Sequence, residues 1–404
     1  MTIRVLGYVM ARNEWPLLGL AITHGFQCGL DHIVVVDHAS TDETHSELKH
    51  LQARWPGRLT VIRLELDQFL QEQTTRVVMS FVGANEYDWV YVFDADEFAL
   101  TSGYVTLVDL LMTVTSEVDA LRYEVLPWVS PHDMNDLDLT QYSRIKERAI
   151  PCVFLDQPAT ILSEQIQNGH INFFDLPFLS KVIVRGKYAH KLSSGAHQIS
   201  DAPSNIIEQK LQTESLRIGH LCLLSQRRIK LKSAQGKFLI DANFPPSHGW
   251  QCQMIYNLDV AGQLEFFWRN HSIQESANQN NTSFASTIVT DDALYIALEE
   301  AVKVFMANDK LTHSPAHNDY QSTNQFKLDN LVKLFNERQL VSTQYKNQVN
   351  VLNTELELVS AQYKNQVDVL QSVLRSNSWR LTKPIRYLLT KARLLRSNQV
   401  RGIT

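Results

Sequence analysis

The sequence lacks several signatures by which common protein classes are recognised. Its four cysteines lie far apart and show no Cys-x-x-Cys spacing: Cys28, Cys152, Cys222 and Cys252. This argues against a cysteine zinc site and suits a reducing, cytoplasmic location. The sequence also has no Gly-x-Gly-x-x-Gly and no Gly-Lys-[Ser/Thr] loop. We therefore expect neither a dinucleotide site nor a P-loop site.

Long apolar runs and an excess of positive charge are missing as well. The sequence has no run of about 18 apolar residues, so we expect no membrane-spanning helix. Residues 1–10 contain no charged segment followed by a cleavage site, so we expect no signal peptide. The formal net charge of −5 argues against a general nucleic-acid-binding protein. The length of 404 residues and the 44% hydrophobic content are ordinary for a globular chain of roughly two or three domains.

Strand-like and helix-like segments alternate along the first part of the chain. Residues 3–10, 32–36, 59–64 and 89–93 are short and rich in β-branched or aromatic residues, as buried strands are. Helices of 10–15 residues are expected between them, and Asn13 is expected to cap the first. This alternation predicts an α/β fold with a mostly parallel, Rossmann-like sheet flanked by helices.

Polar residues follow three of these strands directly. In parallel sheets ligands bind beyond the carboxyl ends of the strands, so these residues predict a binding site: Arg12, Asn13, Glu14, Asp37, Asp94 and Asp96. Asp37 can accept hydrogen bonds from a base or a ribose, besides starting a turn.

Asp94 and Asp96 predict a metal site. Residues two apart on an extended chain point the same way, so both carboxylates are expected to converge on one cation. Mg²⁺ and Mn²⁺ prefer oxygen ligands, and Mg²⁺ is typically held by one or two carboxylates plus substrate phosphates. One alternative is a pair of solvated carboxylates. Another is a phosphatase of the haloacid dehalogenase type, which would carry an aspartyl-phosphate at Asp94.

The C-terminal part differs in composition. QYKNQVNVL at 344–352 recurs eighteen residues later as QYKNQVDVL at 362–370, which is five turns of an α-helix. The repeat predicts a helix that associates with a second copy to form a homodimer. Residues 375–404 contain basic and apolar residues and no acidic residue, which is typical of a helix on an anionic membrane surface. A solvated helix packed on a partner is the alternative. The predicted regions are a main domain at 1–240, a helical and linker region at 241–340, a repeated helix at 341–374 and a basic tail at 375–404.

Three segments together resemble a known family. Residues 12–14 (RNE), 29–44 (GLDHIVVVDHASTDET) and 89–98 (WVYVFDADEF) resemble the nucleotide-sugar-binding half of GT-A-fold glycosyltransferases, in the family 2-like group close to glycosyltransferase family 92. His38 departs from this pattern, in which Asn is usual. Residues 181–185, 195–197 and 218–220 resemble later lysine and histidine landmarks of the family. Residues 376–386 (SNSWRLTKPIR) are similar to the tail of bacterial surface-polysaccharide transferases.

The resemblance implies a metal-dependent glycosyltransferase in bacterial surface polysaccharide or lipopolysaccharide synthesis, located in the cytoplasm at the inner face of the plasma membrane. It implies a nucleoside diphosphate sugar donor, most often UDP-linked, and a glycan or lipid-linked acceptor. Mn²⁺ or Mg²⁺ would bridge the diphosphate to Asp94 and Asp96, and His197 or His220 would complete the metal site. Lys181 would neutralise the leaving diphosphate, the alternative being a plain surface lysine. A degenerate transferase that acts as a scaffold is a further alternative.

A transferase that inverts the sugar linkage also needs a carboxylate base for the acceptor hydroxyl. Four candidates stay open: Asp133, Asp136, Asp138 and Glu164.

Overall fold

The structure is a computed structural model that describes residues 3–65, 71–103, 106–152, 157–274 and 287–308, together with 387, 390 and 391. The chain divides into two compact units, Met1–Val332 and Lys333–Thr404, and every element named below belongs to the first. The predicted repeated helix and nearly all of the basic tail lie outside the described residues. Homodimer formation, membrane binding and the predicted region boundaries therefore stay predictions. No helix within the described ranges is long and apolar enough to cross a membrane.

The predicted α/β fold is confirmed, and its N-terminal half is a parallel sheet. Four strands run parallel in the order β3-β2-β1-β4: β1 (Val5–Ala11), β2 (His32–His38), β3 (Leu59–Leu64) and β4 (Trp89–Val92). All seven residues of β1 are buried, because this strand lies inside the sheet and is covered on both faces. Such strands consist of continuous apolar runs, which is why the sequence located them.

Beyond β4 the main path of the sheet becomes antiparallel. The path continues from β4 through β8 (Lys181–Arg185), β6 (Ala120–Val129) and β7 (Glu147–Ile150) to β11 (Thr287–Thr290). Three further strands pair beside this path: β5 (Glu97–Thr101), β9 (Glu208–Lys210) and β10 (Leu216–His220). The predicted parallel arrangement therefore holds for the first four strands, and the sheet as a whole is mixed.

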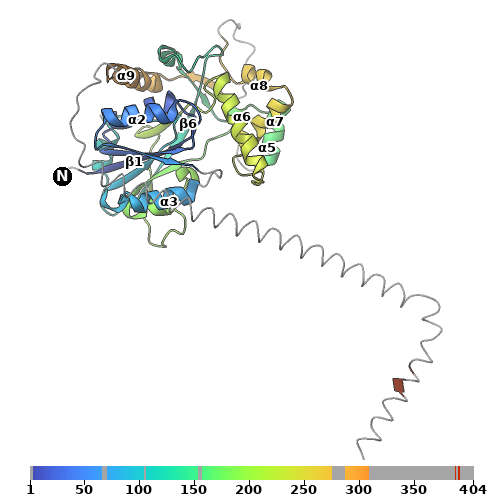
Figure 1. Ribbon diagram of the computed structural model, residues 1–404, viewed down its shortest axis with the longest axis horizontal. Coiled ribbons are helices and arrows are strands. Elements are labelled where there is room, and N and C mark those ends of the chain that lie inside the picture. The colour runs from blue at the N-terminus through green and yellow to red at the C-terminus, as the bar shows by residue number, and fades with distance from the viewer. Residues whose placement is uncertain are drawn as a thin grey trace, which may run out of the picture. The chain divides into compact units, whose positions relative to one another are not determined.

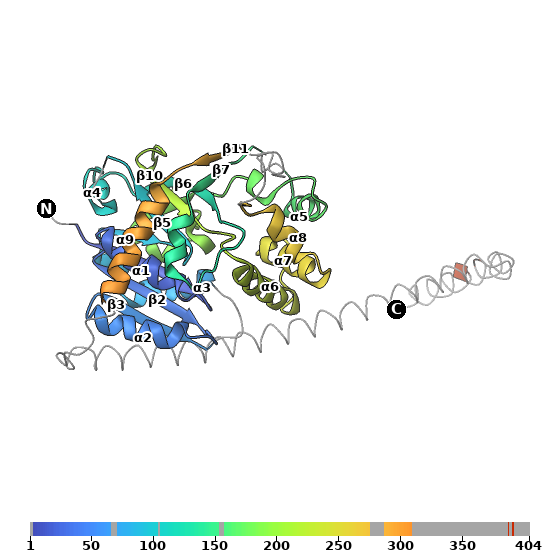
Figure 2. The same ribbon diagram turned by 90° about the horizontal axis from the view of Figure 1, so that it is seen from above.

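Helices cover the parallel half of the sheet (Figure 1). They are α1 (Leu17–Gln27), α2 (Thr44–Arg54) and α3 (Gln71–Phe81). Two later helices, α4 (Leu107–Met112) and α9 (Ala293–Asn308), pack against β5. α9 lies beside α1 (Figure 2), where the rings of Trp15 and Phe305 are 5.7 Å apart. The short 3-10 turns are Ala84–Glu86, Leu139–Arg144, Phe173–Asp175, Gly186–Lys191 and Ser194–Ala196. The predicted helix cap at Asn13 is wrong: Pro16 occupies the cap position of α1 without a side-chain hydrogen bond.

A second apolar core forms beside the sheet from α5 (Ala159–Gln167), α6 (Gln226–Asp241), α7 (Trp250–Val260) and α8 (Leu264–Asn270) (Figure 1). α6 and α7 pack closely, since a Cβ atom on Gly236 would lie 1.9 Å from the Cys252 carbonyl oxygen. Residues 245–283 show no clear hydrophobic pattern, because short helices such as α7 and α8 carry only a weak periodic signal. These helices matter for the site because α6 faces the ends of β1 and β4.

Candidate functional site

The site lies where the order of the parallel strands reverses. β1 pairs with β2 on one side and with β4 on the other, so the chain first extends the sheet in one direction and then returns to the other. In open α/β sheets ligands bind in the crevice outside the carboxyl ends of the strands at this position. Residues 12–14 follow β1 and residues 94–96 follow β4, so the predicted site residues flank the crevice.

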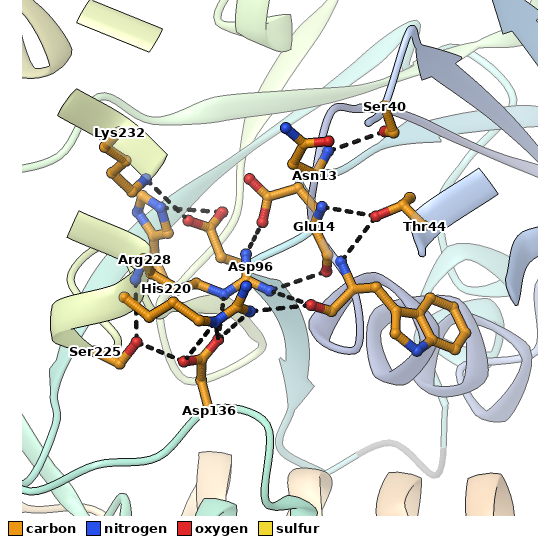
Figure 3. A network of polar contacts seen from close by, with 12 residues as sticks. Asn13, Glu14, Ser40, Thr44, Asp96, Asp136, His220, Ser225, Arg228 and Lys232 are labelled. Atoms are coloured by element: carbon orange, nitrogen blue, oxygen red, sulfur yellow. Dashed lines mark hydrogen bonds and ion pairs between the residues drawn. The ribbon is translucent and has the colours of Figure 1, made fainter. Parts of the chain in front are cut away.

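Asn13 joins the ends of β1 and β2 (Figure 3). It has a positive φ of 58°, a conformation that Asn tolerates better than most residues. Its backbone N–H donates to Ser40 Oγ at 2.9 Å, and its side-chain oxygen accepts from the Thr41 N–H at 2.8 Å. Thr44 Oγ1 accepts from the N–H groups of Glu14 and Trp15, both at 3.1 Å. These bonds fix the loop after β1, although Arg12 within it stays exposed.

Asp94 points toward Lys181. The Lys181 ammonium donates to Asp94 Oδ2 at 2.7 Å and to Glu97 Oε2 at 2.6 Å, and only 3% of the Lys181 side chain is exposed. Burial disfavours the charged amine, but the two carboxylates outweigh burial and hold the pKa of Lys181 above its usual range. Lys181 is thus not a plain surface lysine. It is paired with protein carboxylates, and its predicted contact with a leaving diphosphate stays a prediction.

Asp96 points to a different set of partners (Figure 3). Its Oδ1 lies 3.4 Å from His220 Nε2, and its Oδ2 accepts from Lys232 Nζ at 3.4 Å. Burial opposes ionisation of Asp96, but its electrostatic interactions with His220 and Lys232 outweigh burial and hold its pKa well below the usual range. We therefore treat Asp96 as a carboxylate at neutral pH.

Asp94 and Asp96 do not lie on an extended chain, which was the reason to expect both carboxylates at one cation. The chain turns after β4, where the Glu97 N–H donates to the Asp94 carbonyl at 3.1 Å, and the two aspartates have separate partners. Within the described ranges no three His, Cys, Asp or Glu residues are grouped so that they could hold a metal ion. The metal roles of Asp94 and Asp96 stay predictions.

The two candidate histidines lie in different surroundings. His197 Nδ1 is 3.0 Å from the Ser180 carbonyl, and burial lowers the pKa of His197. His220 contacts the acidic motif through Nε2, and its Nδ1 is buried with no hydrogen-bond partner among the described residues. Of the two, His220 is the one that faces Asp96.

Asp37 is fully buried and bound by protein groups. Its Oδ1 accepts from the Ser40 N–H at 3.0 Å, and its Oδ2 lies 3.0 Å from Arg63 Nη1 and 2.8 Å from His45 Nδ1. The predicted turn role fits these contacts. Its predicted contact with a base or ribose stays a prediction.

A buried ionic network holds α6 against the loop after β1 (Figure 3). Arg228 donates to the Glu14 carboxylate, to the Glu14 carbonyl at 2.9 Å and to Asp136 Oδ2 at 3.1 Å. Asp136 also accepts from Arg227 at 2.6 Å and from the Ser225 hydroxyl at 2.6 Å. Ser225 in turn caps α6 by accepting from the Arg228 N–H. Sequence reasoning missed Arg228 and Lys232 as site residues. The available signal was their spacing of four in a basic helical run, which places both on one face.

The contacts of three of the four candidate carboxylates bear on which of them could act as the catalytic base for the acceptor hydroxyl. Burial raises the pKa of Asp136, but hydrogen bonds from Arg227 and Ser225 outweigh burial and lower it. Asp136 is thus a fully bonded structural carboxylate. Asp133 pairs with Arg144 at 2.6 Å, and Asp138 caps a 3-10 turn through Thr140. The base stays unassigned.

Comparison of the chain with protein-family models gives no match, and comparison with curated proteins gives none either. Among solved structures it is similar to S. aureus TarS 1–349, at 13% identity and a TM-score of 0.28 over 64% of this chain and 72% of that one. The complex of the same fragment with UDP gives the same values. Glucosyl-3-phosphoglycerate synthase of Mycobacterium tuberculosis, with phosphoglyceric acid, has 11% identity and a TM-score of 0.30 over 60% and 81%. Scores this low say nothing about the activity of this chain.

Proposed function

We propose that the chain is a glycosyltransferase. It would move a sugar from a nucleoside diphosphate donor, UDP-linked by the family resemblance, to a hydroxyl group of a glycan or lipid-linked acceptor in bacterial surface polysaccharide synthesis. One observation carries the proposal: the residues after β1 and β4, at the reversal of strand order, contact the basic side chains of α6 (Figure 3). In open α/β sheets ligands bind at this position, and a cluster of charged groups there suits a nucleotide diphosphate.

The charges of the crevice suit this chemistry. In sugar transfer the bond between the anomeric carbon and the diphosphate breaks, and the diphosphate leaves with the electron pair. Positive groups aimed at that developing charge stabilise the transition state. Arg12 is exposed and forms no ion pair with the described residues, and its guanidinium carbon lies 5.9 Å from the centre of the Phe238 ring on α6. Arg12 and Lys232 are therefore the cations that we assign to the diphosphate.

A divalent cation, Mn²⁺ or Mg²⁺, is part of the proposal. Asp96 and His220 would hold it, since a carboxylate oxygen and an imidazole nitrogen 3.4 Å apart are suitable donors for Mn²⁺. Bound there, such an ion would neutralise charge on the leaving diphosphate. Diphosphate oxygens and water would complete its coordination, as is usual for Mg²⁺ sites. Asp94 would have to exchange Lys181 for the ion in order to join them.

Thermal unfolding with a panel of nucleoside diphosphates, each with and without Mn²⁺, tests the proposal. A ligand that binds only the folded state at 100 times its Kd adds about 2.7 kcal/mol of stability. We expect a Mn²⁺-dependent rise of the midpoint with one nucleotide class, lost in Asp96→Asn and kept in the control Asp241→Asn. Asp241 is exposed, and its one ion-pair partner among the residues that the structure describes is Lys237 on α6. No rise with any nucleotide under either condition would refute the proposal.

A further inference from the structure

Lys232 differs from the other buried or half-buried cations of the site. Arg228 and Lys181 have side chains that are 5% and 3% exposed, and both make several short contacts. Lys232 is 28% exposed, and the one ion pair it forms with the described residues is the 3.4 Å contact with Asp96. Charge-assisted hydrogen bonds are usually about 2.7–2.9 Å long. Lys232 is thus loosely held.

The base of the Lys232 side chain is nevertheless fixed. Residues 228 and 232 are one turn apart on α6 and share a face, and Arg228 binds this face to Glu14 and Asp136. A lysine has a flexible four-carbon stem and a compact charge. The ammonium can therefore move between neighbouring anions while the helix stays in place.

A divalent cation bound at Asp96 would compete with Lys232 for this carboxylate. An ion bound by Asp96 and His220 would place two further positive charges beside the ammonium, and like charges repel at short distance. The incoming diphosphate supplies new anionic oxygens in the same crevice, and lysine binds phosphate readily as a point charge. The same donor complex would thus displace Lys232 from Asp96 and offer it a second partner.

We propose, on the basis of the donor site proposed above, that Lys232 alternates between two anions. In the absence of donor it is the counter-ion of Asp96, and in the donor complex it binds the diphosphate. Removing its charge then has two effects of opposite sign. Mn²⁺ alone binds more tightly because its competitor is gone, and the nucleoside diphosphate binds more weakly because it loses a partner.

Two titrations of the full chain test this inference. The first follows free Mn²⁺ by electron paramagnetic resonance in the absence of nucleotide, and the second follows UDP binding by calorimetry at saturating Mn²⁺. For Lys232→Met we expect Mn²⁺ binding about three-fold tighter and UDP binding about ten-fold weaker. The control Lys230→Met removes the same charge from an exposed residue of α6, and we expect less than about two-fold change in either titration. Lys232→Gln, with equal far-UV circular dichroism and unfolding midpoint, serves as a second variant should the Met variant be unstable.

Failure of this inference and failure of the proposed function give different results. If the wild type binds Mn²⁺ and UDP, but Lys232→Met and Lys232→Gln change both affinities in the same direction or neither, the alternation is refuted and the donor site stands. If the wild type binds UDP without any Mn²⁺ binding, the competition is refuted as well. If the wild type binds no nucleoside diphosphate, the proposed function fails and this inference falls with it.

Discussion

Arg228→Met should destabilise the first unit strongly, because it removes the centre of a buried ionic network. Arg228 is 4% exposed and donates to the Glu14 carboxylate, to two backbone carbonyls and to Asp136. Asp136 keeps Arg227 and Ser225 as partners, but the Glu14 carboxylate loses the cation that it binds and stays half-buried. Breaking a buried ion pair by removing one member costs about 3–5 kcal/mol, since it leaves a charge uncompensated.

Arg227→Met is the matched control. Its side chain is 35% exposed, and the carboxylate that it binds keeps Arg228, so we expect a loss of about 1 kcal/mol. Denaturation in guanidinium chloride gives both values from the midpoints and slopes. Adding Glu14→Gln to Arg228→Met should restore about 1–2 kcal/mol, because it removes the unpaired charge.

The stability lost in Arg228→Met should also depend on pH. Burial raises the pKa of Glu14, and the charge of Arg228 opposes that rise. Without Arg228 the pKa rises further, so the folded variant takes up a proton at Glu14 as the pH falls. The difference from the wild type should therefore be smaller at about pH 5 than at about pH 8. A loss equal to that of Arg227→Met, or one that does not change with pH, would refute this account of the network.

Substitutions at Thr44, Gly236 and His271 test three other contacts of the fold. Thr44→Val keeps the shape of the side chain but leaves the N–H groups of residues 14 and 15 without their acceptor. We expect the free energy of unfolding, measured by urea denaturation, to fall by about 2 kcal/mol. The control Thr44→Ser keeps the hydroxyl and should cost about 1 kcal/mol. Gly236→Ala would bring a Cβ atom within 1.9 Å of the Cys252 carbonyl oxygen. This clash should lower the free energy of unfolding by at least about 2 kcal/mol. The control Lys230→Ala on the same helix should lower it by less than about 0.5 kcal/mol. Burial lowers the pKa of His271 to about 4, so its contribution to stability is present above about pH 6.5 and is lost as the pH falls toward 4. His271→Gln should reduce the loss of stability between about pH 7 and pH 4 by up to about 3 kcal/mol, and an equal slope for variant and wild type would contradict this.

The parallel half of the fold was predictable because its signals are local. Each of the first four strands is a short apolar run, and turn residues such as Pro56-Gly57 end the helix between β2 and β3. The carboxyl ends of these strands could be located for the same reason. The sequence alone is therefore enough to place residues 12–14 and 94–96 at one edge of the sheet.

The antiparallel half and the α6 side of the site were not predictable in this way. The pairing of β8 with β4 and β6 joins segments far apart in the chain, and no local pattern specifies such a partner. Arg228 and Lys232 belong to a basic run that, taken alone, is typical of a solvated helix face. They become site residues only because the helices of the second core hold α6 opposite the ends of β1 and β4.

Asp94 and Asp96 belong to one acidic motif but differ in the cations that compensate their charges. Asp94 shares Lys181 with Glu97 at short distances inside the sheet, so its charge is compensated by a cation that has almost no exposed surface. Asp96 has a side chain that is 16% exposed, against 38% for Asp94, and it is compensated by longer contacts with His220 and Lys232. Removing one partner of an ion pair leaves the other charge uncompensated, and this is costly when that charge is buried, as Lys181 is. An incoming cation should therefore exchange the partners of Asp96 more readily than it displaces Lys181 from Asp94.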